Sequence, residues 1–142
     1  MSEIVKTVSR IFSPLIFLFG IYITIHGHLT PGGGFAGGVI IAGAIILEIL
    51  ARGSDEIKLV KKEKKTSIVD ALGILLFWLM AFLGLIVSGI FFLNFIGNGI
   101  PFYIFSAGII PLCNIGIALE VAGSVTIIVL ALILFETGSP ER

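Results

Sequence analysis

Charged residues are scarce in this chain of 142 residues, and long stretches of it have none. Lys, Arg, Asp and Glu make up 13% of the sequence, hydrophobic residues make up 57%, and the mean hydropathy is +1.17. None of the four charged types occurs from Ile11 through Leu47. A soluble domain of this size could not keep such a surface in water, so the composition indicates an integral membrane protein.

Cysteine is nearly absent as well, and the residue sets needed for catalysis are missing. Cys113 is the only cysteine, so no intrachain disulfide can form, and a CxxC or Cys/His zinc site would have too few ligands. The glycine-rich stretch has no GK[ST], which excludes a P-loop, and no nucleophile, base and orienting residue occur together. The formal net charge of zero gives no reason to expect nucleic acid. We therefore expect no catalytic residue, no metal site, no cofactor and no nucleic-acid partner.

Four apolar stretches are long enough to cross a bilayer, which takes about 20 residues in an α-helix. They cover residues 11–26, 35–51, 68–92 and 114–135. The predicted fold is therefore all-α, with one membrane domain over residues 1–142 and four transmembrane helices. The uncharged segment 94–113 is broken by glycine and proline, so we expect it to lie at the membrane interface or under another subunit.

Residues 26–38, between the first two spans, contain six glycines and one proline and predict a tight hairpin. Irregular backbone at membrane depth persists only against protein or a wet cavity, so we expect a partner to cover this hairpin. Small residues then recur one helical turn apart, with Gly34, Gly38 and Ala42 in one row and Gly33 and Gly37 in the next. This spacing lets another helix approach closely and predicts an assembly of several subunits.

Glu120 is the most informative ionisable residue, because charge at membrane depth is expensive and usually functional. It lies six residues into the fourth predicted span, about 9 Å along the helix. Both an ion path or proton relay and a hydrogen bond to a neighbouring subunit would account for it. Glu48 is a weaker ion-path candidate, since Arg52 follows four residues later on the same helix face and both side chains can reach the headgroups.

Two histidines and one aspartate complete the set. His26 and His28, at the outer end of the first span, are further ion-path candidates, but a spacing of two does not put them on one helix face and does not favour a metal pair. Asp70 follows Thr66 and Ser67 near the start of the third span, where helix capping would explain it.

Basic residues are distributed unevenly between the two sides of the predicted membrane domain. Six of the nine Lys and Arg residues lie between the second and third spans, two precede the first span, and Arg142 ends the sequence. The other two connections have none. Short loops rich in Lys and Arg stay in the cytoplasm, so both termini are expected to be cytoplasmic.

The hairpin also carries a family resemblance. Tyr22, His26-Gly-His28, Thr30-Pro-Gly-Gly-Gly-Phe35 and Gly37-Gly38 resemble the signature of the MrpB (MnhB) subunit of multisubunit Na⁺/H⁺ antiporters. The length and the four-span layout are similar over nearly the whole chain. The resemblance implies a small hydrophobic subunit in a prokaryotic cell membrane, with larger antiporter-like subunits as partners and Na⁺ and H⁺ as the transported ions.

Two alternatives differ in the host complex or in the class of protein. The same module occurs in membrane-bound hydrogenases and related ferredoxin-linked complexes, where the resemblance implies sodium handling. Small multidrug exporters also have four helices, but they are shorter and carry their essential Glu in the first span, where this chain has none. In each case we expect a transport subunit in the lipid bilayer and no enzymatic activity in this chain.

Overall fold

The computed structural model describes residues 3–52, 56–97, 99–104 and 106–137, and within these ranges it contains helices and no strands. The helices are α1 (Glu3–Ile25), α2 (Gly34–Arg52), α3 (Glu56–Ser88) and α4 (Ile110–Thr137). Each contains a stretch long and apolar enough to cross a membrane. The all-α prediction with four transmembrane helices is confirmed.

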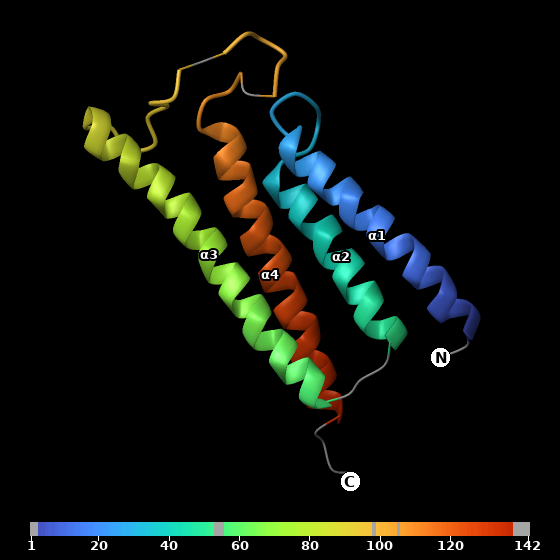
Figure 1. Ribbon diagram of the computed structural model, residues 1–142. Helices are drawn as coiled ribbons and strands as arrows, with labels where there is room; N and C mark the ends of the chain where they lie inside the picture. Colours follow the sequence, from blue (N-terminus) through green and yellow to red (C-terminus); the bar gives the residue numbers. More distant parts are fainter. Residues whose placement is uncertain (1–2, 53–55, 98, 105, 138–142) are drawn as a thin grey trace.

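The helices stand side by side in the order α1, α2, α4, α3 (Figure 1). Among the described residues α3 contacts α4 and neither of the other two helices, while α2 packs between α1 and α4. Successive helices alternate in direction, so α2 and α4 are parallel neighbours. The beginnings of α1 and α3 and the ends of α2 and α4 therefore lie at one end of the molecule, which we call the lower end, as in Figure 1.

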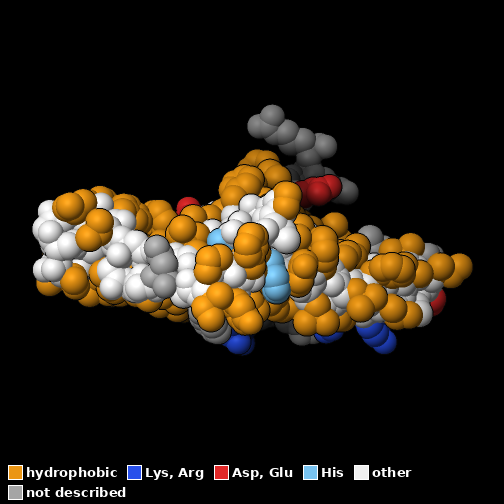
Figure 2. Space-filling view, turned by 90° about the horizontal axis from the view of Figure 1, so that it is seen from above, with side chains coloured by type: hydrophobic (Ala, Val, Ile, Leu, Met, Phe, Trp, Pro, Cys, Tyr) orange, Lys and Arg blue, Asp and Glu red, His pale blue; other side chains and the backbone are white. Residues whose placement is uncertain are grey.

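This arrangement is a single layer of helices. Seen from above, the outline is much longer than it is wide, and hydrophobic side chains cover both long edges (Figure 2). Large apolar side chains are more than half exposed, among them Leu75 (57%), Ile128 (60%) and Leu132 (64%). A single layer cannot cover these faces by itself, so they must contact lipid or other subunits.

The best-covered part of the layer is the line where α2 meets α4. Ile49 and Leu130 are buried there, with Ile45, Ile133 and Leu134 packed around them. Higher on α4, the hydroxyl of Thr126 is fully buried and donates to the Ala122 carbonyl at 2.7 Å, which satisfies it inside an apolar contact.

The helix ends differ from the sequence expectation on both sides of the upper connection. α3 ends at Ser88 and not at residue 92, because Gly89 adopts φ +75° while its N–H still bonds to the Leu85 carbonyl. α4 begins at Ile110, so Pro111 and Cys113 belong to the helix and not to the broken segment that was expected to run to residue 113. Proline fits the first turn because an N–H there has no partner in the helix.

Candidate ion site between α3 and α4

Glycines bring the backbones of α3 and α4 into direct contact. A Cβ placed on Gly73 would lie 2.5 Å from the Glu120 nitrogen and 2.7 Å from the Gly116 carbonyl oxygen. A Cβ on Gly123 would lie 2.7 Å from the Cβ of Asp70. The helices can therefore approach this closely only while these positions lack side chains. We call this line of contact the α3–α4 seam.

Asp70 forms the polar contact that crosses the seam. Its carboxylate oxygen Oδ1 accepts a hydrogen bond from the Ser124 hydroxyl at 2.7 Å, and both residues are half-buried. The expectation that Asp70 caps the third helix is wrong, because α3 begins at Glu56 and Asp70 lies several turns inside it. The apolar stretch of α3 starts at Lys61, so the carboxylate lies within the candidate membrane span, where it needs such a partner.

Glu120 lies deeper in the helix layer than the sequence suggested. Because α4 begins at Ile110, Glu120 is ten residues, or about 15 Å, from the upper end of the helix and not about 9 Å. The residue is half-buried. Within the part of the chain that the structure describes, its carboxylate has neither a hydrogen-bond partner nor an ion-pair partner. It is an acidic group at membrane depth whose counterpart must come from elsewhere.

The two carboxylates belong to consecutive turns of the same seam. On α4, Glu120 and Ser124 are four residues apart and so share a helix face. On α3, Gly73 faces Glu120 and Asp70 faces Gly123, which places Asp70 one turn closer to the lower end. One turn is about 5.4 Å along the axis. The seam thus combines two carboxylates and a hydroxyl, all oxygen groups that can hold protons or hard cations.

Glu48 lies elsewhere, near the lower end of α2. It forms an ion pair with Arg52, as the four-residue spacing predicted, and both side chains are partly exposed. α2 does not contact α3, so Glu48 does not share the seam with Glu120.

The histidines have separate partners at the upper end, near the middle of the face in Figure 2. The ring of His26 stacks on Tyr22 with centroids 4.2 Å apart, and its Nδ1 lies 3.1 Å from the Tyr22 carbonyl oxygen. The Nε2 of His28 lies 3.4 Å from the carbonyl oxygen of Tyr103, in the connection between α3 and α4. Among the described residues no group of three His, Cys, Asp or Glu side chains could hold a metal ion.

The two rows of small residues on α2 meet two different helices of this same chain. Gly37 faces α1, since a Cβ there would lie 2.8 Å from the Gly20 carbonyl oxygen. Gly38 faces α4, with the Ala118 oxygen and the Val121 Cβ both at 2.9 Å from such a Cβ. The approaching helices are therefore α1 on one side and α4 on the other.

The rest of the glycine cluster follows the same division. Gly34 faces Asn114 and Ile117 on α4, and Ala42 is completely buried. Gly33 has φ +128°, a backbone conformation that side-chain-bearing residues rarely adopt, and its carbonyl accepts the Gly37 N–H as α2 begins. These positions pack the helices of one subunit, and the need for partners follows instead from the flat, apolar layer.

Sequence reasoning missed the seam itself. Gly116, Glu120 and Gly123 recur at helical spacing and Gly73 follows Asp70 by three residues, so each helix carried a visible signal. Neither pattern names its partner helix, and Asp70 and Ser124 are 54 residues apart.

Comparison with known proteins places the chain among membrane transport components. Residues 4–127 match the family described as a domain related to the MnhB subunit of Na⁺/H⁺ antiporters. An uncharacterized protein of Methanocaldococcus jannaschii is 37% identical over 126 residues, which cover 84% of this chain and 48% of that protein. The chain thus spans about half the length of that relative.

Shorter matches carry antiporter names. A Na⁺/H⁺ antiporter subunit from Bacillus subtilis, of the B type, is 44% identical over 48 residues, or 34% of each chain. A putative antiporter subunit, mnhB2, from Staphylococcus aureus is 39% identical over 54 residues, or 38% of each chain.

A solved structure is similar over almost the whole chain. It is the membrane-bound sulfane sulfur reductase (MBS), an archaeal respiratory membrane complex, in which one chain superposes with a TM-score of 0.74 at 30% identity. The match covers 92% of this chain and 57% of that one. Together with the family match over residues 4–127, this shows that the chain belongs to the family of domains related to the MnhB subunit of Na⁺/H⁺ antiporters.

Proposed function

We propose that this chain is a membrane subunit of a multisubunit Na⁺/H⁺ antiporter, in which it supports ion translocation and assembly. The family and the antiporter names of its relatives support this function. The observation that carries it is Glu120, a half-buried carboxylate at membrane depth with no partner among the described residues. Such a group needs a proton, a cation or a neighbouring subunit.

In this proposal Glu120 takes up a proton or a cation from a neighbouring subunit, because its side chain is reachable from outside the layer. Asp70 and Ser124 lie one turn closer to the lower end and form the next station in the same seam. The glycine contacts fix the spacing of the two helices, and with it the distance between the two carboxylates. A preset spacing of this kind lets a proton or cation move without rearranging the helices.

The similarity to a chain of an archaeal respiratory membrane complex favours a second host. In that case the same subunit would handle Na⁺ within a redox complex, such as a membrane-bound hydrogenase or a related ferredoxin-linked enzyme, and the redox chemistry would belong to other subunits. The third alternative, a small multidrug exporter, lacks support from the family match.

We also propose that the lower end faces the cytoplasm of a prokaryotic cell. The described Lys and Arg side chains gather at this end, on the first turns of α1, the last turn of α2 and the first turns of α3. Short segments rich in basic residues are retained on the cytoplasmic side.

Purification of the tagged chain in mild detergent, followed by mass spectrometry, tests the host. Co-purification of antiporter subunits alone supports a stand-alone antiporter. Additional iron–sulfur or nickel subunits would indicate a redox complex. A homodimer of this chain without other subunits would contradict both hosts.

Substitution of Glu120 tests the ion-handling role. Glu120→Gln keeps size and hydrogen bonding but cannot titrate, whereas Glu120→Ala removes both. We expect the Gln variant to assemble and to lose Na⁺-dependent proton transport in membrane vesicles. Glu48→Gln is the matched control and should transport normally, because Glu48 lies outside the seam. Antiport at the parental rate by a fully assembled Glu120→Ala complex would contradict the role.

A further inference from the structure

Two adjoining cavities lie between α1 and α2 at the lower end, away from the seam. The first, which we call the headgroup pocket, has a volume of about 380 Å³, and its lining includes Lys6, Arg10, Ser13, Pro14, Glu48 and Arg52. The second, the apolar groove, has a similar volume of about 380 Å³, and its lining includes Ser13, Pro14, Phe17, Leu18, Ala44 and Ile45. Both volumes fall in the usual range of about 300–1,000 Å³ for small-molecule sites.

The two cavities form one continuous site, because Ser13, Pro14 and Glu48 line both. The hydroxyl of Ser13 donates to the Ala44 carbonyl at 2.8 Å and is buried, which ties α1 to α2 at the junction of the two cavities. From Lys6 to Leu18 the combined site extends over twelve residues of α1, or about 18 Å. It therefore runs from the charged end of the helix into its apolar part.

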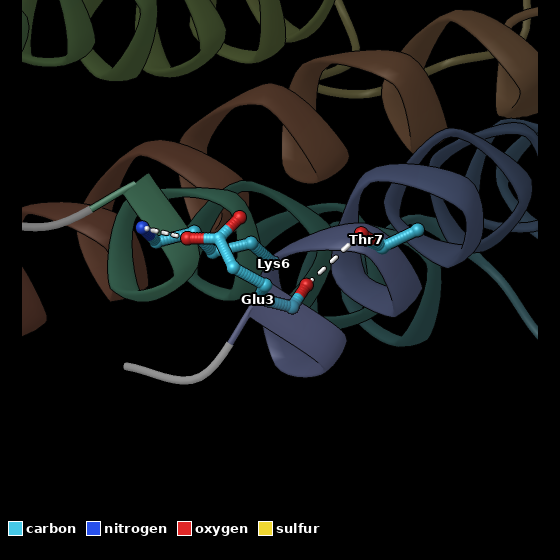
Figure 3. Close-up of polar contacts among 3 residues, drawn as sticks. All are labelled: Glu3, Lys6 and Thr7. Carbon is cyan, nitrogen blue, oxygen red and sulfur yellow. Dashed lines mark hydrogen bonds and ion pairs between the residues drawn. The ribbon is translucent and has the colours of Figure 1, made fainter.

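Charge is distributed unequally along this site. The headgroup pocket has three cationic side chains and one carboxylate, and that carboxylate is already paired with Arg52. Lys6 pairs with Glu3 at 3.0 Å on the first turn of α1, where Thr7 also bonds to the Glu3 carbonyl (Figure 3). The Glu3 carboxylate is 87% exposed, so this pair is weak. Arg10 has no ion-pair partner among the described residues.

The apolar groove has the opposite character. Phe17 and Leu18 are exposed on α1, at 39% and 61%, and Ile45 on α2 is partly covered. The groove begins where the charged pocket ends and continues along the helices toward the middle of the layer. Cations at one end and an apolar channel at the other match the two parts of a phospholipid, a phosphate headgroup and a hydrocarbon chain.

We propose that the α1–α2 site binds one anionic phospholipid, with its phosphate beside Lys6 and Arg10 and one hydrocarbon chain along Phe17 and Leu18. An excess of cations favours an anionic lipid over a zwitterionic one of the same chain length. The apolar groove favours a lipid over a free phosphate ion or a soluble phosphate ester. Ordered lipid in this position would complete the surface of a layer that is one helix thick.

Native mass spectrometry of the purified complex containing this chain measures the binding. The complex is titrated with dioleoylphosphatidylglycerol and, separately, with dioleoylphosphatidylcholine. The test variant combines Lys6→Gln and Arg10→Gln, and the matched control combines Lys64→Gln and Lys65→Gln, which removes two exposed cations from α3 at the same end. We expect the affinity for phosphatidylglycerol to fall roughly fivefold for each cation removed from the pocket, or roughly 25-fold in the test variant.

The outcomes are distinguishable. Equal losses in the test and control variants would show diffuse attraction and overturn the site. Equal retention of the two lipids by the parental complex would also overturn it, as would displacement of phosphatidylglycerol by inorganic phosphate at the same concentration. The test variant removes side chains that are exposed or half-exposed, so its helical circular dichroism should match that of the parent.

Photolabelling locates the hydrocarbon chain independently. A phosphatidylglycerol with a diazirine in its acyl chain should label the peptides that contain Phe17, Leu18 and Ile45 in membranes. Labelling confined to α3 or to other subunits would overturn the proposal. Carbodiimide coupling of Lys6 to a carboxylate on another subunit would show instead that an acidic protein segment fills the pocket.

Discussion

Replacement of Gly38 by alanine tests how α2 packs on α4. A Cβ at this position would lie 2.9 Å from the Ala118 carbonyl oxygen and 2.9 Å from the Val121 Cβ. Carbon atoms rarely come this close to such neighbours, and one of the two is backbone that cannot rotate away. The helices would have to separate, and overpacking of this kind typically costs about 1–3 kcal/mol.

Gly43 provides a matched control on the same helix. A Cβ there would meet nothing within 4 Å, and the residue is exposed. Both Gly→Ala changes remove backbone freedom and alter helix propensity equally, so these effects cancel when the two variants are compared. The difference in their free energies of unfolding therefore isolates the packing contribution, which we expect to be about 1–3 kcal/mol.

Reversible unfolding of the purified chain by SDS in mixed micelles, followed by circular dichroism, measures this difference. Gly38→Ala should unfold at lower SDS than the parent, and Gly43→Ala should not. Gly38→Leu adds more volume at the same contact and should prevent the complex from accumulating in membranes. Equal stability of the two alanine variants, or a less stable Gly43→Ala, would refute the packing argument.

Three further outcomes are expected. Ser124→Ala leaves the Asp70 carboxylate without its donor at membrane depth and should lower the free energy of unfolding by about 1–3 kcal/mol, whereas Ser124→Thr keeps the hydroxyl and should recover most of it; no change in the alanine variant would show that another group pairs with Asp70. Glu48→Gln removes a partly exposed ion pair with Arg52 and should cost no more than about 0.5 kcal/mol in the same titration, so a large loss would reveal a further partner. A phosphatase fused to the C-terminus should be inactive and a fluorescent protein should be active, as expected of a cytoplasmic end; an active phosphatase would reverse the proposed orientation.

Features that depend on neighbours in the chain followed from the sequence. Span length and hydropathy predicted four membrane helices, because a bilayer of nearly constant thickness demands about 20 apolar residues from any helix that crosses it. The pair between Glu48 and Arg52 followed from helical spacing alone. The family resemblance, carried by residues of the hairpin between α1 and α2, agreed with the family match over residues 4–127.

The helix ends were harder to predict, since backbone geometry and not hydropathy sets them. Hydropathy continues past Ser88, but the positive φ of Gly89 stops α3 there. Pro111 suggested a break, yet it occupies a turn where proline is tolerated. The early start of α4 moved Glu120 deeper, and the early start of α3 turned Asp70 from an expected helix cap into a membrane-embedded carboxylate.

The order of the helices was decided only in the tertiary structure. All four helices are apolar on most of their surface, so no single face of α2 or α3 specifies its neighbour, and α3 passes over α2 to pack on α4. That order assigns Gly37 to α1 and Gly38 to α4. It also joins Asp70 to Ser124 across 54 residues of sequence, because backbone contact at Gly73 and Gly123 is possible only between these two helices. Hydropathy determines that a segment enters the membrane, whereas close packing between particular small residues determines which segment lies beside it.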